Sequence, residues 1–168
     1  MLFRSDVGGV TVGLRTEADV RAAYDAMMTS VATRAPGATI SGVLLQQMRS
    51  GGREFIAGIV REPGFGPLIM FGLGGVLVEA LRDVVFRMVP IGDRDADEML
   101  DGIRGTKLLG ELRGDPAVDR VALMGALRRV AQLGNDFPRI AELDANPLLA
   151  SSAGVVALDA RVRLAVAR

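Results

Sequence analysis

The stretch that decides the fold is EFIAGIVREPGFGPLIMF, residues 54–71, in which two apolar runs flank a turn. Residues 54–60 and 67–71 are rich in Ile, Val and Phe, residue types that favour β-strands. Between them, Pro63-Gly64-Phe65-Gly66 has the composition of a turn. The sequence therefore predicts two neighbouring strands that begin a β-meander.

Short strands are also predicted outside this stretch. In the apolar segment 84–89 that ends before Pro90, the side chains of Val85, Arg87 and Val89 share one face. By composition and turn signals, the additional strands are expected at residues 43–48, 84–89, 140–144 and 155–158.

Three helices complete the pattern. Thr16-Glu17-Ala18-Asp19 is a capping box, and the apolar spacing behind it predicts a helix that ends before Pro36-Gly37. Asp93 can cap a second helix, and Asp115-Pro116 can open a third. The apolar side chains of the third helix are expected to face the core; they are Val118, Val121, Met124, Leu127 and Ala131. We therefore expect an α+β fold with an antiparallel or mixed β-sheet and packed helices.

Composition narrows the possible functions. The 168 residues contain 20 basic and 20 acidic side chains, so a basic surface for nucleic acid is not expected. The absence of Cys and His excludes disulfides, thiol nucleophiles and histidine general bases. No targeting or membrane segment stands out, which predicts a cytoplasmic location and no membrane partner. The length fits one domain or one piece of a domain.

Two groups of residues could bind a ligand. Gly74 and Gly75 lie in a glycine-rich segment that could approach a phosphate or could form a crowded corner of the sheet. Asp144 and Asn146 lie two residues apart, hence on one side of an extended chain, and Asp159 follows on the next predicted strand. Oxygen donors of this kind suit Mg²⁺, although Asp144 and Asn146 could instead support a turn before Pro147.

Charged residues within apolar strand-like segments also need partners. Glu54, Glu79 and Arg87 are the clearest cases. They either pair with neighbouring charges at the sheet surface or face a charged ligand.

These segments together resemble a known family. In order, they match the ATP-grasp domain of ADP-forming acyl-CoA synthetases (acetate–CoA ligase type, β-subunit) and, more distantly, the β-subunit of succinyl-CoA synthetase. The resemblance covers nearly the whole chain and rests on residues 5–10, 42–48, 53–58, 65–67, 71–75, 78–79, 86–87, 90, 142–148 and 158–161.

The resemblance implies that ATP and Mg²⁺ bind and that a phosphoryl group is transferred between ATP and the acid–CoA ligase machinery. By position, Asn146 and Asp159 match magnesium ligands with Asp144 beside them. The nucleotide-binding positions implied in the same way are Gln46, Gln47 and Met48 in the adenine hinge, Glu54 near the ribose, Arg87 near the phosphates, and Gly74, Gly75 and Glu79 in a turn facing the nucleotide.

The sequence departs from the family in two ways. The family has a histidine implicated as a phosphate carrier where this chain has Phe3, so no catalytic residue is assigned. The family strands that supply a phosphate-binding lysine would precede residue 1. We therefore expect residues 1–168 to form a partial ATP-grasp domain that is inactive alone.

The resemblance also implies partners, namely CoA-binding and CoA-ligase domains in the same chain or in another one. Apolar surface left by the missing strands could support a homo-oligomer. Because Phe3 replaces the histidine, an alternative function is a non-catalytic regulatory or assembly domain. That alternative resembles synthetase-like regions fused to a lysine acetyltransferase.

Overall fold

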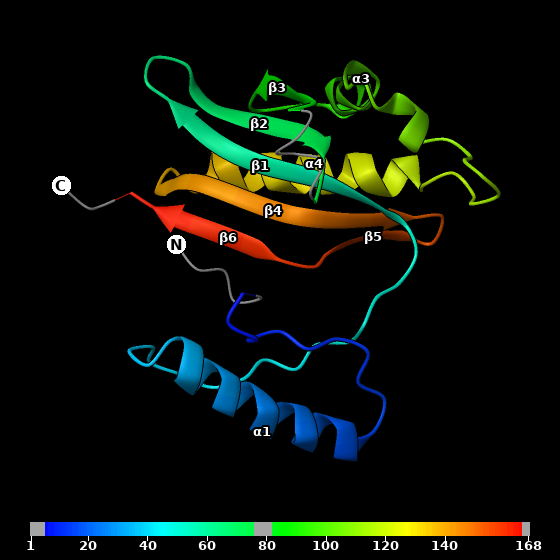
Figure 1. The fold of residues 1–168 in the computed structure, drawn as a ribbon. Helices are drawn as coiled ribbons and strands as arrows, with labels where there is room; N and C mark the ends of the chain where they lie inside the picture. The colour runs from blue at the N-terminus through cyan, green and yellow to red at the C-terminus, as the bar shows by residue number, and fades with distance from the viewer. Residues whose placement is uncertain (1–5, 76–81, 166–168) are drawn as a thin grey trace. The chain divides into compact units, whose positions relative to one another are not determined.

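The structure is a computed structural model that describes residues 6–75 and 82–165. The chain divides into two compact units, residues 1–50 and residues 51–168. Within the described residues, the first unit contains a single helix, and the second contains the β-sheet and the helices that pack on it (Figure 1). The hydrophobic core therefore belongs to the second unit.

Helix α1, Glu17–Arg34, begins at the predicted capping box. The backbone N–H of Asp19 donates to Thr16 Oγ1 at 3.1 Å, and the N–H of Thr16 donates to Asp19 Oδ2 at 2.9 Å. These two bonds satisfy backbone donors that a helix N-terminus leaves without partners. No residue of α1 is buried, so the apolar residues of this helix do not contribute to the core.

The strand predicted at residues 43–48 is wrong, because no described residue between 35 and 50 is in a strand. Leu44, Leu45 and Met48 are instead 76%, 67% and 62% exposed. A β-strand needs a neighbour that binds its backbone N–H and C=O groups. No described strand pairs with this segment, so its composition alone does not produce a strand.

The second unit is built on a six-stranded sheet in which every pair of neighbours is antiparallel. The strand order is β3-β2-β1-β4-β5, and β6 also pairs with β4. The predicted hairpin of residues 54–71 forms β1 and β2, which confirms the α+β class with an antiparallel sheet. The strands are β1 (Arg53–Glu62), β2 (Gly66–Leu73), β3 (Val84–Met88), β4 (Ile140–Ser151), β5 (Gly154–Ala157) and β6 (Ala160–Leu164).

Strand β4 is longer than the predicted segment 140–144. It continues to Ser151, and its pairing with β1 shifts register between Phe55 and Ala57, as a β-bulge does. One half of β4 pairs with β6 and the other half with β5. The strand β6 was not predicted. This arrangement puts Asp144 and Asn146 in the interior of the sheet instead of in a turn.

Helices α3 (Asp93–Gly102) and α4 (Arg120–Asp136) pack on one face of the sheet, with the short 3₁₀ helix η1 (Thr106–Leu108). In Figure 1, α4 runs behind β1 and β4. The rings of Phe55 and Phe71 stack with centroids 5.5 Å apart, and Leu123 and Leu127 of α4 are fully buried in the same core. Burial of these apolar side chains is the main stabilising contribution of this face.

Helix α4 begins later than predicted. The N–H of Val118 donates to Leu109 O at 3.1 Å and the N–H of Asp119 donates to Ser151 O at 2.8 Å, so these residues are held outside the helix. Asp119 is the N-cap, and its Oδ1 accepts from Ala122 N at 2.9 Å. The inward position expected for Val121 is therefore wrong, since its side chain is 78% exposed while Leu123 is buried.

Two arginines hold the ends of β1 against the helical layer. Arg61 donates to the carbonyl oxygens of Ile140, at 2.6 Å, Phe137, at 3.2 Å, and Gly134. Arg53, at the other end, donates to the carbonyl oxygens of residues 108 (2.8 Å), 110 and 115 (3.4 Å). Cationic donors are well suited to the unpaired carbonyls at a helix C-terminus, such as those at the end of α4.

Candidate functional site

Helices α3 and α4 cover one face of the sheet, and we call the opposite face the far face. The candidate site lies on the far face. Leu143 and Ala145 are buried in the core, so Asp144 between them points to the far face. Asp144 lies directly across from Gly58 of β1. A Cβ on Gly58 would lie 2.7 Å from the carbonyl oxygen of Leu143, so glycine is what permits the two strands to approach closely there.

Asp144 has an oxygen without a partner. Its Oδ1 is buried and accepts no hydrogen bond from the described residues. Burial raises the pKa of the Asp144 carboxyl above its ordinary value; Arg161 opposes this shift, while the negative charges of Glu142 and Asp159 add to it. An orphaned buried carboxylate oxygen is costly, which makes it a candidate ligand for a cation.

Asn146 connects β4 to the glycine-rich segment after β2. Its Oδ1 accepts a hydrogen bond from Gly75 N at 3.2 Å. Gly75 has a φ of +59°, and a Cβ there would overlap Glu54 Oε2. Gly74 N donates to Glu54 O at 2.9 Å. The structure therefore brings together Glu54, Gly74, Gly75 and Asn146, which are far apart in the sequence.

Asp159 lies next to this cluster. The N–H of Asn146 donates to the carbonyl oxygen of Asp159 at 3.2 Å, and Asp159 Oδ1 accepts from Ala160 N at 2.9 Å. The charge of Asp159 is close enough to shift the pKa of Asp144. Asp144, Asn146 and Asp159 thus form one group of oxygen donors. In the described part of the chain, no three acidic side chains are grouped as a complete metal site.

Arg87 does not belong to this group. It lies directly across from Ile69, whose side chain is fully buried on the helical face. Arg87 therefore faces the helical layer, where its Nη2 lies 3.8 Å from Glu98 Oε2 of α3. The structure thus gives Arg87 a partner on the opposite side of the sheet from Asp144.

The other predicted positions lie in the first unit or outside the described residues. Gln46, Gln47 and Met48 are exposed residues of the first unit. Glu79 and Phe3 lie outside the described residues.

Sequence reasoning missed an ion-pair network on the far face. Arg161 Nη2 donates to Glu142 Oε1 at 3.2 Å, and Arg163 Nε donates to Glu142 Oε2 at 3.0 Å. The hydrogen bond from Arg163 lowers the pKa of Glu142, although partial burial opposes the shift; the charges of Arg163 and Arg161 lower it further. The alternation of Glu142 with Asp144 along the strand was the signal available in the sequence.

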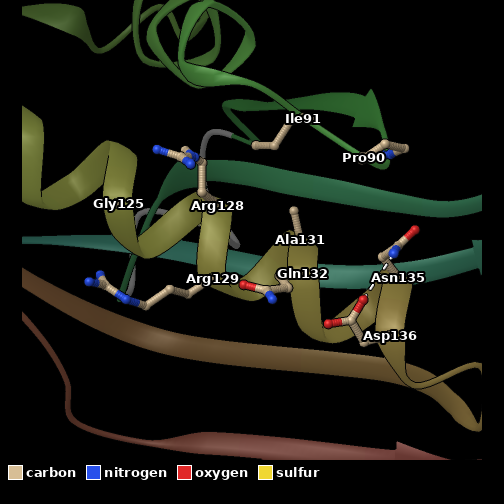
Figure 2. A pocket seen from close by; sticks show the side chains of 9 residues that line it. All are labelled: Pro90, Ile91, Gly125, Arg128, Arg129, Ala131, Gln132, Asn135 and Asp136. Carbon is tan, nitrogen blue, oxygen red and sulfur yellow. Dashed lines mark hydrogen bonds between the residues drawn. The ribbon is translucent and has the colours of Figure 1, made fainter.

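A hollow elsewhere on the second unit lies apart from this site. Figure 2 shows that residues of α4, including Arg129, Gln132 and Asn135, line it together with Pro90 and Ile91. Since α4 covers the helical face of the sheet, this hollow is on the other side from Asp144. It contains none of the predicted site residues.

Residues 1–164 match the ATP-grasp domain family. The chain belongs to the ATP-grasp family. It is 42% identical over 166 residues to the 4-hydroxybutyrate–CoA ligase (ADP-forming) of Nitrosopumilus maritimus, covering 98% of this chain and 24% of that protein. It is 38% identical over 164 residues to the β-subunit of acetate–CoA ligase (ADP-forming) I of Pyrococcus furiosus, covering 98% of this chain and 71% of that subunit.

Solved structures show the same similarity to the ATP-grasp family. Acetyl-coenzyme A synthetase 1 of Ca. Korarchaeum cryptofilum, in complex with coenzyme A and Ca-AMPCP, matches with a TM-score of 0.91 and 45% identity over 96% of this chain and 70% of that chain. A complex of that enzyme with coenzyme A and Mg-AMPPCP matches with a TM-score of 0.86 and 41% identity over 98% of this chain and 71% of that chain. In that complex, the phosphohistidine segment points towards the nucleotide-binding site.

These matches confirm the resemblance to the ATP-grasp domains of ADP-forming acyl-CoA synthetases. The chain spans about a quarter of the length of the Nitrosopumilus ligase and 71% of the Pyrococcus subunit. The homologous region therefore occurs both within longer ligases and in a separate subunit. No helix in the described ranges is long and apolar enough to cross a membrane.

Proposed function

We propose that this chain supplies an ATP- and Mg²⁺-binding part of an ADP-forming acyl-CoA ligase. The observation that carries the proposal is the orphaned Asp144 Oδ1 on the far face, beside Asn146 and Asp159. Family membership and similarity to ligases crystallised with nucleotide analogues support it.

The donor set of the site suits Mg²⁺. Mg²⁺ prefers oxygen ligands, uses one or two carboxylates, and takes its remaining ligands from water and substrate phosphates. Asp144, Asn146 and Asp159 would hold the ion, with Asn146 oriented by the N–H of Gly75. When bound with ATP, the ion neutralises phosphate charge that otherwise opposes phosphoryl transfer.

The remaining residues would orient the nucleotide. A Cβ at Gly74 would collide with the backbone of Phe55, and one at Gly75 would collide with Glu54 Oε2, so both glycines let this turn pack closely against β1 beside Glu54. We propose that the same turn faces the nucleotide. We assign Glu54 to the ribose, and Gln46, Gln47 and Met48 to the adenine, from the family resemblance. Glu79 would belong to the same turn as Gly75.

The partners follow from the relatives. We propose that residues 1–168 form a partial ATP-grasp domain that works with CoA-binding and CoA-ligase domains, in the same chain or in another one. Some relatives are longer ligases and others are separate β-subunits, which supports either arrangement. Self-association remains a prediction. The alternative of a non-catalytic domain fused to an acetyltransferase is not favoured, because the relatives reported above are ligases and synthetases.

Calorimetric titration of ATP, with and without Mg²⁺, tests the proposal on residues 1–168 together with the CoA-binding and CoA-ligase domains, an assembly we call the full-length protein. Binding should require Mg²⁺ and should be lost in Asp159→Ala and Asn146→Ala. The control is Asp115→Ala, which changes an exposed aspartate outside the site and should bind normally. Unchanged ATP binding and acyl-CoA formation in both site variants would overturn the magnesium assignment. No ATP binding to the full-length protein would overturn the proposed function.

A further inference from the structure

The arginines on the sheet divide between its two faces. Arg53 donates to a backbone carbonyl of η1, Arg61 donates to carbonyls at the end of α4, and Arg87 pairs with Glu98 of α3. These three side chains are therefore engaged on the helical face. The remaining arginines of the described strands, Arg161 and Arg163 of β6, have registers that place them on the far face.

Arg161 is the arginine closest in register to the orphaned carboxylate. It lies directly across from Asp144 in the pairing of β6 with β4, and Arg163 lies across from Glu142. Side chains at directly opposed positions of an antiparallel pair have Cβ atoms about 4.5–5.5 Å apart and point to the same face. The guanidinium of Arg161 is therefore a neighbour of the proposed cation site.

Arg161 also retains free donor capacity. Its side chain is 72% exposed, and the ion pair that the structure gives it is the one with Glu142. A guanidinium carries several N–H donors in a planar fork that matches phosphate geometry. One acceptor on Glu142 leaves further N–H groups of Arg161 available to a second anion.

The local charge balance favours an anion once a cation is bound. The site and its surroundings hold three carboxylates, Glu142, Asp144 and Asp159, and two guanidinium groups, Arg161 and Arg163, which both pair with Glu142. Without a divalent cation the negative side chains are in excess, and with one the positive groups are in excess. A phosphate oxygen placed between the cation and Arg161 would balance that charge.

We propose that Arg161 contacts a phosphate oxygen of the bound nucleotide beside the cation, and that Glu142 positions Arg161 for this contact. The inference rests on the proposed function. It assigns to Arg161 the phosphate contact that the family resemblance gave to Arg87. A preorganised cation at this position stabilises charge on the phosphates both in the bound nucleotide and during transfer.

The test compares ligands with and without phosphate. In the full-length protein, Arg161→Met should weaken Mg²⁺-dependent ATP binding at least tenfold and leave adenosine binding unchanged, whereas Arg161→Lys should weaken ATP binding less. Binding of Mn²⁺ without nucleotide should not weaken in Arg161→Met, because removing a nearby positive charge does not disfavour a cation. Arg94→Met, which removes an exposed arginine of α3, is the matched control.

Three results would overturn the inference while leaving the proposed function intact. They are wild-type ATP affinity in Arg161→Met, an equal loss of adenosine and ATP binding in that variant, and a larger loss of ATP binding in Arg87→Met than in Arg161→Met. Failure of the unmodified protein to bind Mg²⁺–ATP would instead overturn the proposed function, and the inference with it.

Discussion

The backbone N–H of Gly75 donates to Asn146 Oδ1 at 3.2 Å, which joins the end of β2 to the middle of β4. This bond fixes the amide of Asn146 with its oxygen towards the glycine-rich segment. It also explains how a cation ligand and a nucleotide-facing turn could act together, because a shift of either one moves the other.

Replacing Gly75 tests this coupling. In Gly75→Ala, the added Cβ overlaps the Glu54 carboxylate. The variant also loses about 1–2 kcal/mol of stability, because a residue with a Cβ is strained at a φ of +59°. Gly64→Ala is the control, because it also has a positive φ but no atom within 4 Å of the added Cβ. Urea unfolding should show similar losses in the two variants, since the exposed Glu54 side chain can move aside.

Nucleotide affinity should separate these two glycine variants. Only Gly75→Ala displaces the Glu54 carboxylate and strains the bond to Asn146, so only this variant should lose ATP affinity. Wild-type affinity in Gly75→Ala would contradict the proposed role of the turn.

Asp144→Asn should separate stability from ligand binding. The change replaces a buried charged oxygen that lacks a partner by a neutral amide, so the metal-free protein should gain about 1 kcal/mol in free energy of unfolding. The increase in melting temperature that Mg²⁺–ATP gives should disappear. Asp115→Asn should change neither quantity. A destabilised Asp144→Asn protein that still gains stability from Mg²⁺–ATP would contradict the site.

Asp83 should control acid stability. It is 5% exposed; burial opposes its ionisation, but hydrogen bonds from Arg104 N at 2.8 Å and Gly105 N at 2.7 Å hold its pKa below the ordinary value of 3.8. Its contribution to stability is therefore complete above that ordinary value and is lost as the pH falls through the lower pKa of the folded state.

The Asp83→Asn variant measures this contribution. It should lose about 1–3 kcal/mol at pH 7, because two part-buried hydrogen bonds from backbone N–H groups lose their charged acceptor. Urea unfolding between pH 4 and about pH 2 should then show a shallower loss of stability than in the wild type. Parallel pH profiles of the two proteins would show that the Asp83 carboxylate is not responsible.

Arg61→Met should loosen the end of α4. The change removes donors from the carbonyls of Gly134, Phe137 and Ile140, so we expect a loss of about 1–3 kcal/mol in urea unfolding. Arg129→Met changes an exposed arginine of the same helix and should cost less than about 0.5 kcal/mol. Equal losses in the two variants would argue against the capping role of Arg61.

Local signals in the sequence predicted local structure well. The capping box at Thr16 and the turn of residues 63–66 were correct because the atoms that decide them lie within a few residues. The strand predicted at 43–48 failed because strands depend on a partner. The start of α4 was misplaced because Asp119 binds Ser151, a residue that its own neighbourhood does not reveal.

In the candidate site too, local features could be predicted from the sequence and features that depend on distant strands could not. The spacing of Asp144 and Asn146 was enough to predict that they share a face. The alternation of side chains along a strand also correctly placed Arg87 on the same face as Val85, but it could not show which face the helices cover. Only the cross-strand partner of Arg87, the buried Ile69, shows that this arginine faces the helical layer. Likewise, Arg161 lies across from Asp144 because of the register of β6, a strand that was not predicted from the sequence.

Strand β1 is paired on both edges, by β2 and β4, and its terminal arginines hold the loops at both ends. Each amide of β1 is bonded to one of these two neighbours, and β2 and β4 are themselves paired on their other edges, so neither can separate from β1 without opening the sheet. In hydrogen–deuterium exchange, the backbone amides of β1 should exchange only when the whole second unit unfolds. The strand that carries Glu54 and lies beside Asp144 would then be the most persistent part of the sheet, while the edge strand β6 that carries Arg161 can fluctuate around it.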